Sequence, residues 1–204
     1  MRLAQIISYV FHPGLMPTLG LVLILNLDSY LRHTIPSNLK LFVLGLVFIN
    51  TFVFPVLLLF FLRFRKAISS YQLDNRKERI LPFGITCIFY FFTYNLIQKT
   101  PLPPIVVSLF LGMTISVVMA YLTTYFYKIS IHMMGISGVL AGLLVLYLQF
   151  SANYFVEIVL VSLVWGLIGY ARLKLKKHTA AELYTGVVVG FVSVFIPTYF
   201  GLTI

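Results

Sequence analysis

Acidic residues are scarce in this chain, and cysteine is nearly absent. The 204 residues contain five Asp and Glu against 15 Lys and Arg, and Cys87 is the single cysteine. One cysteine excludes a framework of disulfide bonds within the chain. So few carboxylates also argue against a Mg²⁺ site or a two-metal centre, which are built mainly from carboxylate oxygens. We therefore expect no metal and no cofactor.

Long apolar runs are abundant instead. Hydrophobic residues make up 60% of the chain and charged residues 10%. This composition is typical of a helical protein that crosses a membrane several times. The formal charge of +10 is compatible with nucleic-acid binding, but basic residues at the ends of apolar runs usually set membrane topology and contact lipid headgroups. We expect the lipid bilayer as a partner and no nucleic acid.

Seven segments are candidate transmembrane helices of a single domain that covers residues 1–204. They are 14–31, 40–62, 83–98, 104–127, 133–150, 154–171 and 182–203. A helix needs about 20 residues to cross the hydrocarbon, so 83–98 is short and is alternatively re-entrant. The predicted fold is an all-α, polytopic bundle of six or seven transmembrane helices. We expect an integral, multi-pass protein of the inner (plasma) membrane of a bacterium.

Glycine pairs recur inside the candidate spans at helical spacing. Small residues of this kind let transmembrane helices approach closely, and two prolines are expected to kink the spans that contain them. These residues are Gly135 and Gly138, Gly166 and Gly169, Gly186 and Gly190, Pro55 and Pro197.

Positive charge is segregated between the two ends of the predicted bundle. If every segment crosses the membrane, the second, fourth and sixth connections lie on the same face as the N-terminus. We call this the basic face, and by the positive-inside rule it is cytoplasmic. Its cations are Arg2, Arg63, Arg65, Lys66, Arg76, Lys77, Arg79, Lys128, Arg172, Lys174, Lys176 and Lys177, whereas Arg32, Lys40 and Lys99 lie on the opposite face.

The sixth connection contains the most informative residues, Arg172, His178 and Glu182. His178 and Glu182 are four apart, so on a helix they share a face and can form a hydrogen bond. A carboxylate behind a histidine fixes its tautomer and supports the positive charge that it acquires on attack. The planar guanidinium of Arg172 suits phosphate oxygens. The alternative is a basic helix end whose charged side chains extend to the membrane surface.

Two further charged stretches lie on the basic face. Lys128, Ser130 and His132 form a turn that offers a hydroxyl and an imidazole that titrates near neutral pH. Lys77 and Arg79 belong to a basic stretch before the third span, where cations can neutralise a phosphoryl group. The alternatives are an interfacial histidine in the first case and attraction to lipid headgroups, about 1 kcal/mol per cation, in the second.

Together the three stretches resemble the type 2 phosphatidic acid phosphatase (PAP2) family of membrane lipid phosphatases. That family carries Lys-x6-Arg-Pro, then Pro-Ser-Gly-His, then Ser-Arg-x5-His-x3-Asp, on loops of a helical bundle. The resemblance covers the region from Arg76 to Glu182. The spacing Arg172-x5-His178-x3-Glu182 is its most specific part.

The resemblance implies a phosphatase of lipid monophosphates or diphosphates that forms a phosphohistidine and needs no metal. It implies His178 as the nucleophile, Glu182 as the residue that orients it, and His132 as the acid that protonates the leaving oxygen. A membrane lipid phosphate is the implied substrate. The residues implied to hold its phosphate are Arg172, Ser130 with its neighbouring amides, Lys77, Arg79 and Lys128.

The chain departs from the family pattern at several positions. Ala171 replaces the serine before the arginine of the third motif, and Glu182 replaces an aspartate. Ile129 and Ile131 stand where the second motif has proline and glycine, which predicts a reshaped amide cradle. The Lys-x6-Arg-Pro motif has no counterpart at its expected spacing. The family's core also usually has six spans rather than seven.

Two alternatives to the phosphatase stay open, the first of which is favoured by these departures. One is a non-catalytic relative that binds or moves anionic lipids through its basic face. The other is a metalloenzyme with His12, His132, His178 and Glu182 as zinc ligands. The sequence leaves open the lipid substrate, the oligomeric state and the side of the membrane. Charge places the site in the cytoplasm, whereas the resemblance places it outside.

Overall fold

A computed structural model describes residues 1–27, 30–73, 75–150 and 153–203. The described chain is helical almost throughout. In chain order its elements are α1 (Arg2–Val10), η1 (Pro13–Leu15), α2 (Met16–Asn26), α3 (Tyr30–Thr34), α4 (Ser37–Phe48), η2 (Ile49–Val53), α5 (Phe54–Phe64), η3 (Arg76–Arg79), α6 (Ile80–Ile97), α7 (Pro104–Thr124), α8 (Ile131–Phe150), α9 (Phe155–Lys174) and α10 (Ala180–Phe200).

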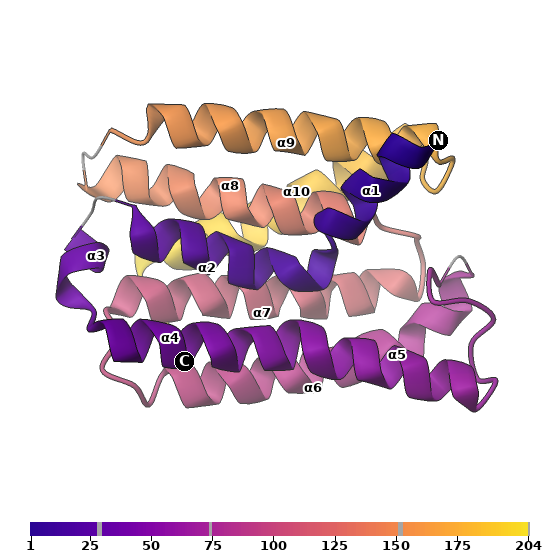
Figure 1. Cartoon of the computed structure of the whole chain (residues 1–204), viewed down its shortest axis with the longest axis horizontal. Helices are drawn as coiled ribbons and strands as arrows, with labels where there is room; N and C mark the ends of the chain where they lie inside the picture. The colour runs from indigo at the N-terminus through magenta and orange to yellow at the C-terminus, as the bar shows by residue number, and fades with distance from the viewer. Residues whose placement is uncertain (28–29, 74, 151–152, 204) are drawn as a thin grey trace.

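Seven helical segments of the described chain are long and apolar enough to cross a membrane, which confirms the predicted all-α, multi-pass organisation. Their long axes run side by side in one bundle (Figure 1). The segments are Arg2–Asn26, Ser37–Phe64, Arg76–Ile97, Pro104–Thr124, Ile131–Phe150, Phe155–Lys174 and Ala180–Phe200.

The centre of the bundle is formed by α7 and α8, which are the most buried of these segments. Helix α10 packs against both of them, α9 packs on the outside of α8, and α6 lies against α7. Fully buried side chains such as Leu21, Tyr94, Phe110 and Leu143 form the main core. The outer surface of the bundle is apolar as well, as expected of helices that face lipid.

The first predicted span, 14–31, differs from the structure at both ends. Helix begins at Arg2, is interrupted before Pro13, and α2 ends at Asn26, after which α3 is a separate short helix. Residues 28 and 29 of that span lie outside the described residues. Proline lacks an amide N–H and has a fixed φ, so Pro13 starts the new turn η1 rather than continuing α1.

The third segment is longer than the predicted 83–98. It is helical from Arg76 to Ile97, which is long enough to cross the membrane without re-entering. Pro82, just before the predicted span, lies in the first turn of α6. Amide groups in the first turn have no acceptor within the helix, so proline costs no hydrogen bond there.

The second span contains a π-helical segment, η2, just before Pro55. A proline ring clashes with the carbonyl four residues earlier, and the wider π turn relieves that clash. Asn50 and Thr51 of η2 are buried, and Thr51 Oγ1 donates to Gly14 O at 3.0 Å. The distortion at Pro55 therefore places a hydroxyl against the turn that precedes α2.

Glycines bring α10 unusually close to α8. A Cβ on Gly186 would lie 2.5 Å from Ser130 O, and a Cβ on Gly190 would lie 2.1 Å from Met134 O. This confirms the close approach predicted for Gly186 and Gly190. Gly166 has nothing within 4 Å of such a Cβ, so it does not serve a helix contact as its spacing had suggested.

Replacing Gly190 with alanine is expected to destabilise the bundle. The new methyl would meet backbone atoms of Met134, which cannot rotate away as a side chain can. Overpacking of this kind costs about 1–3 kcal/mol, so Gly190→Ala should lower the melting temperature of the detergent-solubilised protein. Gly166→Ala is the matched control, because its methyl would enter open space. Equal melting temperatures for both variants would contradict the close contact.

Candidate active site

The three charged stretches meet at one end of the bundle. That end carries the N-terminus and the connections α5–α6, α7–α8 and α9–α10 (Figure 1). Helix α8 begins at Ile131 and α10 begins at Ala180. The N–H of Ser130 donates to the carbonyl of Glu182 at 3.2 Å, which joins the two helix starts directly.

His178 and Glu182 form the predicted hydrogen-bonded pair, although His178 lies just before α10 and not on its face. His178 Nδ1 and Glu182 Oε2 are 2.8 Å apart, and the histidine side chain is 1% exposed. Because a carboxylate oxygen accepts, the Nδ1 atom carries the proton. The neutral imidazole therefore keeps its lone pair on Nε2.

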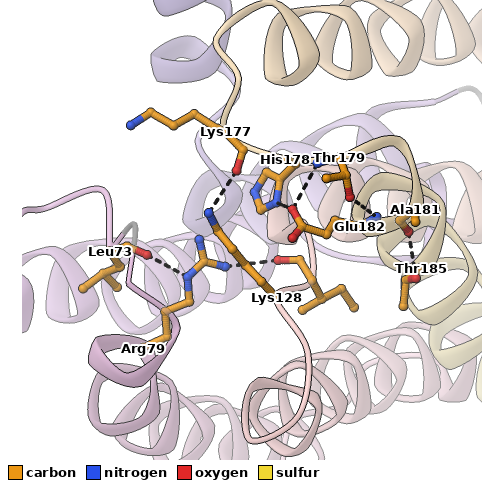
Figure 2. A network of polar contacts seen from close by, with 10 residues as sticks. Leu73, Arg79, Lys128, Lys177, His178, Thr179, Ala181, Glu182 and Thr185 are labelled. Atoms are coloured by element: carbon orange, nitrogen blue, oxygen red, sulfur yellow. Dashed lines mark hydrogen bonds and ion pairs between the residues drawn. The ribbon is translucent and has the colours of Figure 1, made fainter.

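The start of α10 holds Glu182 in this position. Thr179 is the N-cap: its Oγ1 accepts from Glu182 N at 3.3 Å, while Glu182 Oε2 accepts from Thr179 N at 3.2 Å. This reciprocal arrangement is a capping box. One carboxylate oxygen therefore serves both the helix end and His178, so the local fold and the orientation of the imidazole depend on the same side chain (Figure 2).

Two cations from other connections lie beside this pair (Figure 2). Arg79 is 4% exposed; its Nε donates to Leu73 O at 2.8 Å and its Nη1 donates to Ile129 O at 3.1 Å. Lys128 Nζ donates to Lys177 O at 3.0 Å. These contacts tie the α5–α6, α7–α8 and α9–α10 connections together, so the charges are held in place by the backbone around them.

Burial and positive charge keep His178 neutral. Desolvation has the largest effect, and the charges of Arg172, Arg79 and Lys128 add to it, so that the pKa of His178 falls from 6.5 to about 2. An uncharged imidazole can act as a nucleophile, whereas an imidazolium cannot. Arg172 itself lies in the last turn of α9 and is half-buried.

Ser130 and His132 lie at the start of α8 and are also buried. Ser130 Oγ and His132 Nδ1 have no hydrogen-bond partner among the described residues. Buried polar atoms are rarely left without one, so each such atom calls for an explanation. The N–H of Ser130 donates to Glu182 O, so this amide cannot bind phosphate as part of the predicted cradle. The hydroxyl of Ser130 is still able to do so.

The N-terminal segment contributes a contact that the sequence had not indicated. Ser8 O, in α1, accepts from His132 Nε2 at 3.2 Å. The acceptor is a backbone carbonyl. Every residue has one, so the sequence could not identify this one. The ring centroids of His12 and His132 are 6.3 Å apart. The proline after His12 was the one sequence feature that could have indicated a turn near His132.

Lys77 is placed differently from the other predicted site residues. It is exposed on η3, and its backbone N–H donates to Asn75 Oδ1 at 3.1 Å. The structure thus buries Arg79, rather than Lys77, within electrostatic reach of His178.

Metal-ligating side chains are not grouped in the part of the chain that the structure describes. No set of three or more His, Cys, Asp and Glu side chains there is arranged to hold an ion. The four zinc ligands of the metalloenzyme alternative do not form such a set.

Comparison of the chain with protein-family models, with curated proteins and with solved structures finds no match.

The low pKa of His178 should make stability depend on pH. Below pH 6.5 the unfolded chain takes up a proton at His178 that the folded chain does not, so stability falls as pH decreases, by at most about 1.4 kcal/mol per pH unit. His178→Gln should reduce this dependence when melting temperatures are measured across acid pH. His33→Gln, at an exposed histidine of α3, is the control. Identical pH dependence in wild type and His178→Gln would contradict the shift.

Proposed function

We propose that this protein is a membrane-embedded phosphatase of lipid monophosphates or diphosphates that acts through a phosphohistidine at His178. The observation that carries the proposal is the 2.8 Å pair of His178 Nδ1 and Glu182 Oε2. It is buried and lies within the electrostatic reach of Arg172, Arg79 and Lys128. The resemblance of the Arg172, His178 and Glu182 spacing to type 2 phosphatidic acid phosphatases adds support.

The first step is attack of His178 Nε2 on phosphorus. A bond forms between Nε2 and phosphorus, and the bond from phosphorus to the lipid oxygen breaks with its electron pair on that oxygen. His178 becomes positively charged, and Glu182 stabilises this charge through the Nδ1 proton. Phosphoryl transfer needs little further covalent chemistry from the protein, so positioning and neutralisation of charge supply most of the catalysis.

His132 supplies the proton that the leaving oxygen requires. Its Nε2–H is held by Ser8 O, so Nδ1 is the atom that exchanges protons. The negative charge of the bound phosphate offsets the nearby cations, so His132 takes up a proton at Nδ1 and gives it to the lipid oxygen, and the lipid alcohol departs. In the second step water attacks phosphorus, its proton passes to His132 Nδ1, and the bond to His178 breaks. Inorganic phosphate leaves and both histidines return to their initial states.

Positive charge and helix starts provide the phosphate-binding environment. Arg172, Arg79 and Lys128 place three positive charges within electrostatic reach of the His178–Glu182 pair. Helix α8 begins next to Ser130, where first-turn amides have no acceptor within the helix and the helix dipole favours an anion. A lipid phosphate has its headgroup at the membrane surface and its chains in the bilayer, which matches a site at the end of a bundle.

A second candidate is a non-catalytic protein that binds or moves anionic lipids. Near-complete burial of the His178 side chain favours this alternative, because a nucleophile must reach the phosphorus atom. The same cations would then hold a headgroup without reacting. Removal of the nucleophile separates the two candidates.

His178→Ala should abolish phosphate release, by at least about 10⁴-fold, because no other group replaces the nucleophile. Binding to vesicles that contain anionic lipid should remain, since the cations are unchanged. Wild type incubated with a labelled lipid phosphate should carry acid-labile, alkali-stable label, as expected for a phosphorus–nitrogen bond. His33→Ala, at the opposite end of the bundle, should behave as wild type. Absence of phosphate release by the wild type from every lipid mono- and diphosphate would leave the binding candidate.

Glu182→Gln should lower kcat by about 10²-fold or more with little change in KM. The amide cannot stabilise a charged His178 as a carboxylate does. Glutamine still fits the capping box at the third position of α10, so the helix start should persist. Steady-state kinetics with a circular-dichroism melt would check both points. Equal turnover in variant and wild type would remove Glu182 from the mechanism.

A further inference from the structure

The turn between α1 and α2 is built against the start of α8. Pro13 begins η1, and His12 is its N-cap, with Nδ1 accepting from Gly14 N at 3.2 Å. A Cβ on Gly135 would lie 2.8 Å from Met16 Cγ and 3.9 Å from Pro13 O, so α8 passes close to this turn and to the start of α2. The turn is thus seated one helical turn along α8 from His132.

The distorted second span supports the same turn from the other side. Thr51 Oγ1 donates to Gly14 O at 3.0 Å. The ring of Phe52 meets that of His12 edge-on, with centroids 5.6 Å apart and an interplanar angle of 75°. Thr51 and Phe52 belong to the π-helical segment η2, and such segments occur frequently at functional sites.

The His12 ring thereby packs edge-on with the rings of both Phe52 and His132. Its centroid is 6.3 Å from that of His132, at an interplanar angle of 70°. Edge-to-face aromatic contacts at this separation favour one relative orientation of the two rings. His132 is also held through Nε2 by Ser8 O. The N-terminal segment therefore fixes His132 in two ways, through the hydrogen bond of Nε2 and through ring contact with His12. Nδ1 is left for proton transfer.

We propose that His12 is a positioning residue that fixes the ring of His132 for proton transfer to the leaving oxygen. This inference rests on the proposed phosphatase function and concerns the same site. His12 acts through its packed ring and does not itself touch the substrate. It therefore contributes to both proton transfers of His132 Nδ1, of which kcat/KM reports the first, in which the lipid oxygen needs a proton.

This role predicts a dependence on the leaving group. An alkyl phosphate releases a strongly basic alkoxide unless a proton is supplied, so its cleavage requires a well-placed acid. A nitrophenyl phosphate releases a weakly basic phenolate and needs little help. A misplaced His132 should therefore slow the first substrate far more than the second, whereas general loss of folded protein slows both equally.

The test compares kcat/KM of each variant for a long-chain alkyl phosphate and for a nitrophenyl phosphate with an alkyl tail on its ring. In His12→Asn the amide oxygen can still accept from Gly14 N, so the turn is kept and only the ring is lost. We expect the alkyl-to-nitrophenyl ratio to fall about 10- to 100-fold. Because both rates come from one preparation, the ratio does not depend on the folded fraction.

His12→Phe keeps a ring packed with those of Phe52 and His132 and should hold the ratio within a few-fold of wild type. His33→Asn makes the same substitution at the opposite end of the bundle and should leave the ratio unchanged. An unchanged ratio in His12→Asn, or an equal fall in His12→Phe and His12→Asn, would overturn the positioning role. Failure of the wild type to cleave either substrate would instead refute the phosphatase function on which this inference rests.

Discussion

The close approach of α8 and α10 is the constraint on which the site depends. Gly186 and Gly190 let the backbone of α10 lie against Ser130 and Met134 of α8. Interhelical contact of this kind relies on dispersion and backbone complementarity, because lipid provides no hydrophobic drive between helices. The contact sets the two helix starts side by side. Residues 130–132 and 178–182 therefore share one site although they belong to different connections.

Backbone carbonyls help to hold the charged groups at this end of the bundle. Arg79 and Lys128 donate to carbonyls of Leu73, Ile129 and Lys177. A buried cation is costly unless its hydrogen bonds are satisfied, and these carbonyls satisfy part of that requirement without neutralising the charge. The charges of Arg172, Arg79 and Lys128 favour a neutral His178.

Local structure and chemistry are coupled through Glu182. The carboxylate completes the capping box of α10 and also accepts from His178. The start of α10 thus orients the imidazole directly. No additional loop is needed for this, which suits a chain with short connections. On the other side of the site, the helix break before Pro13 brings α1 and its Ser8 carbonyl back to His132.

The sequence by itself determined the number of candidate spans, the segregation of charge and the pairing of His178 with Glu182. Each of these depends on composition or on spacing within one segment, although His178 lies just before α10 and the capping box, rather than a shared helix face, holds Glu182 against it. Only the tertiary structure decided that Arg79 rather than Lys77 is buried within electrostatic reach of His178, and that Ser8 contacts His132. The latter contact joins residues 124 apart in the chain and uses a backbone carbonyl. Backbone groups are identical at every residue, so packing alone selects which of them meets a given side chain.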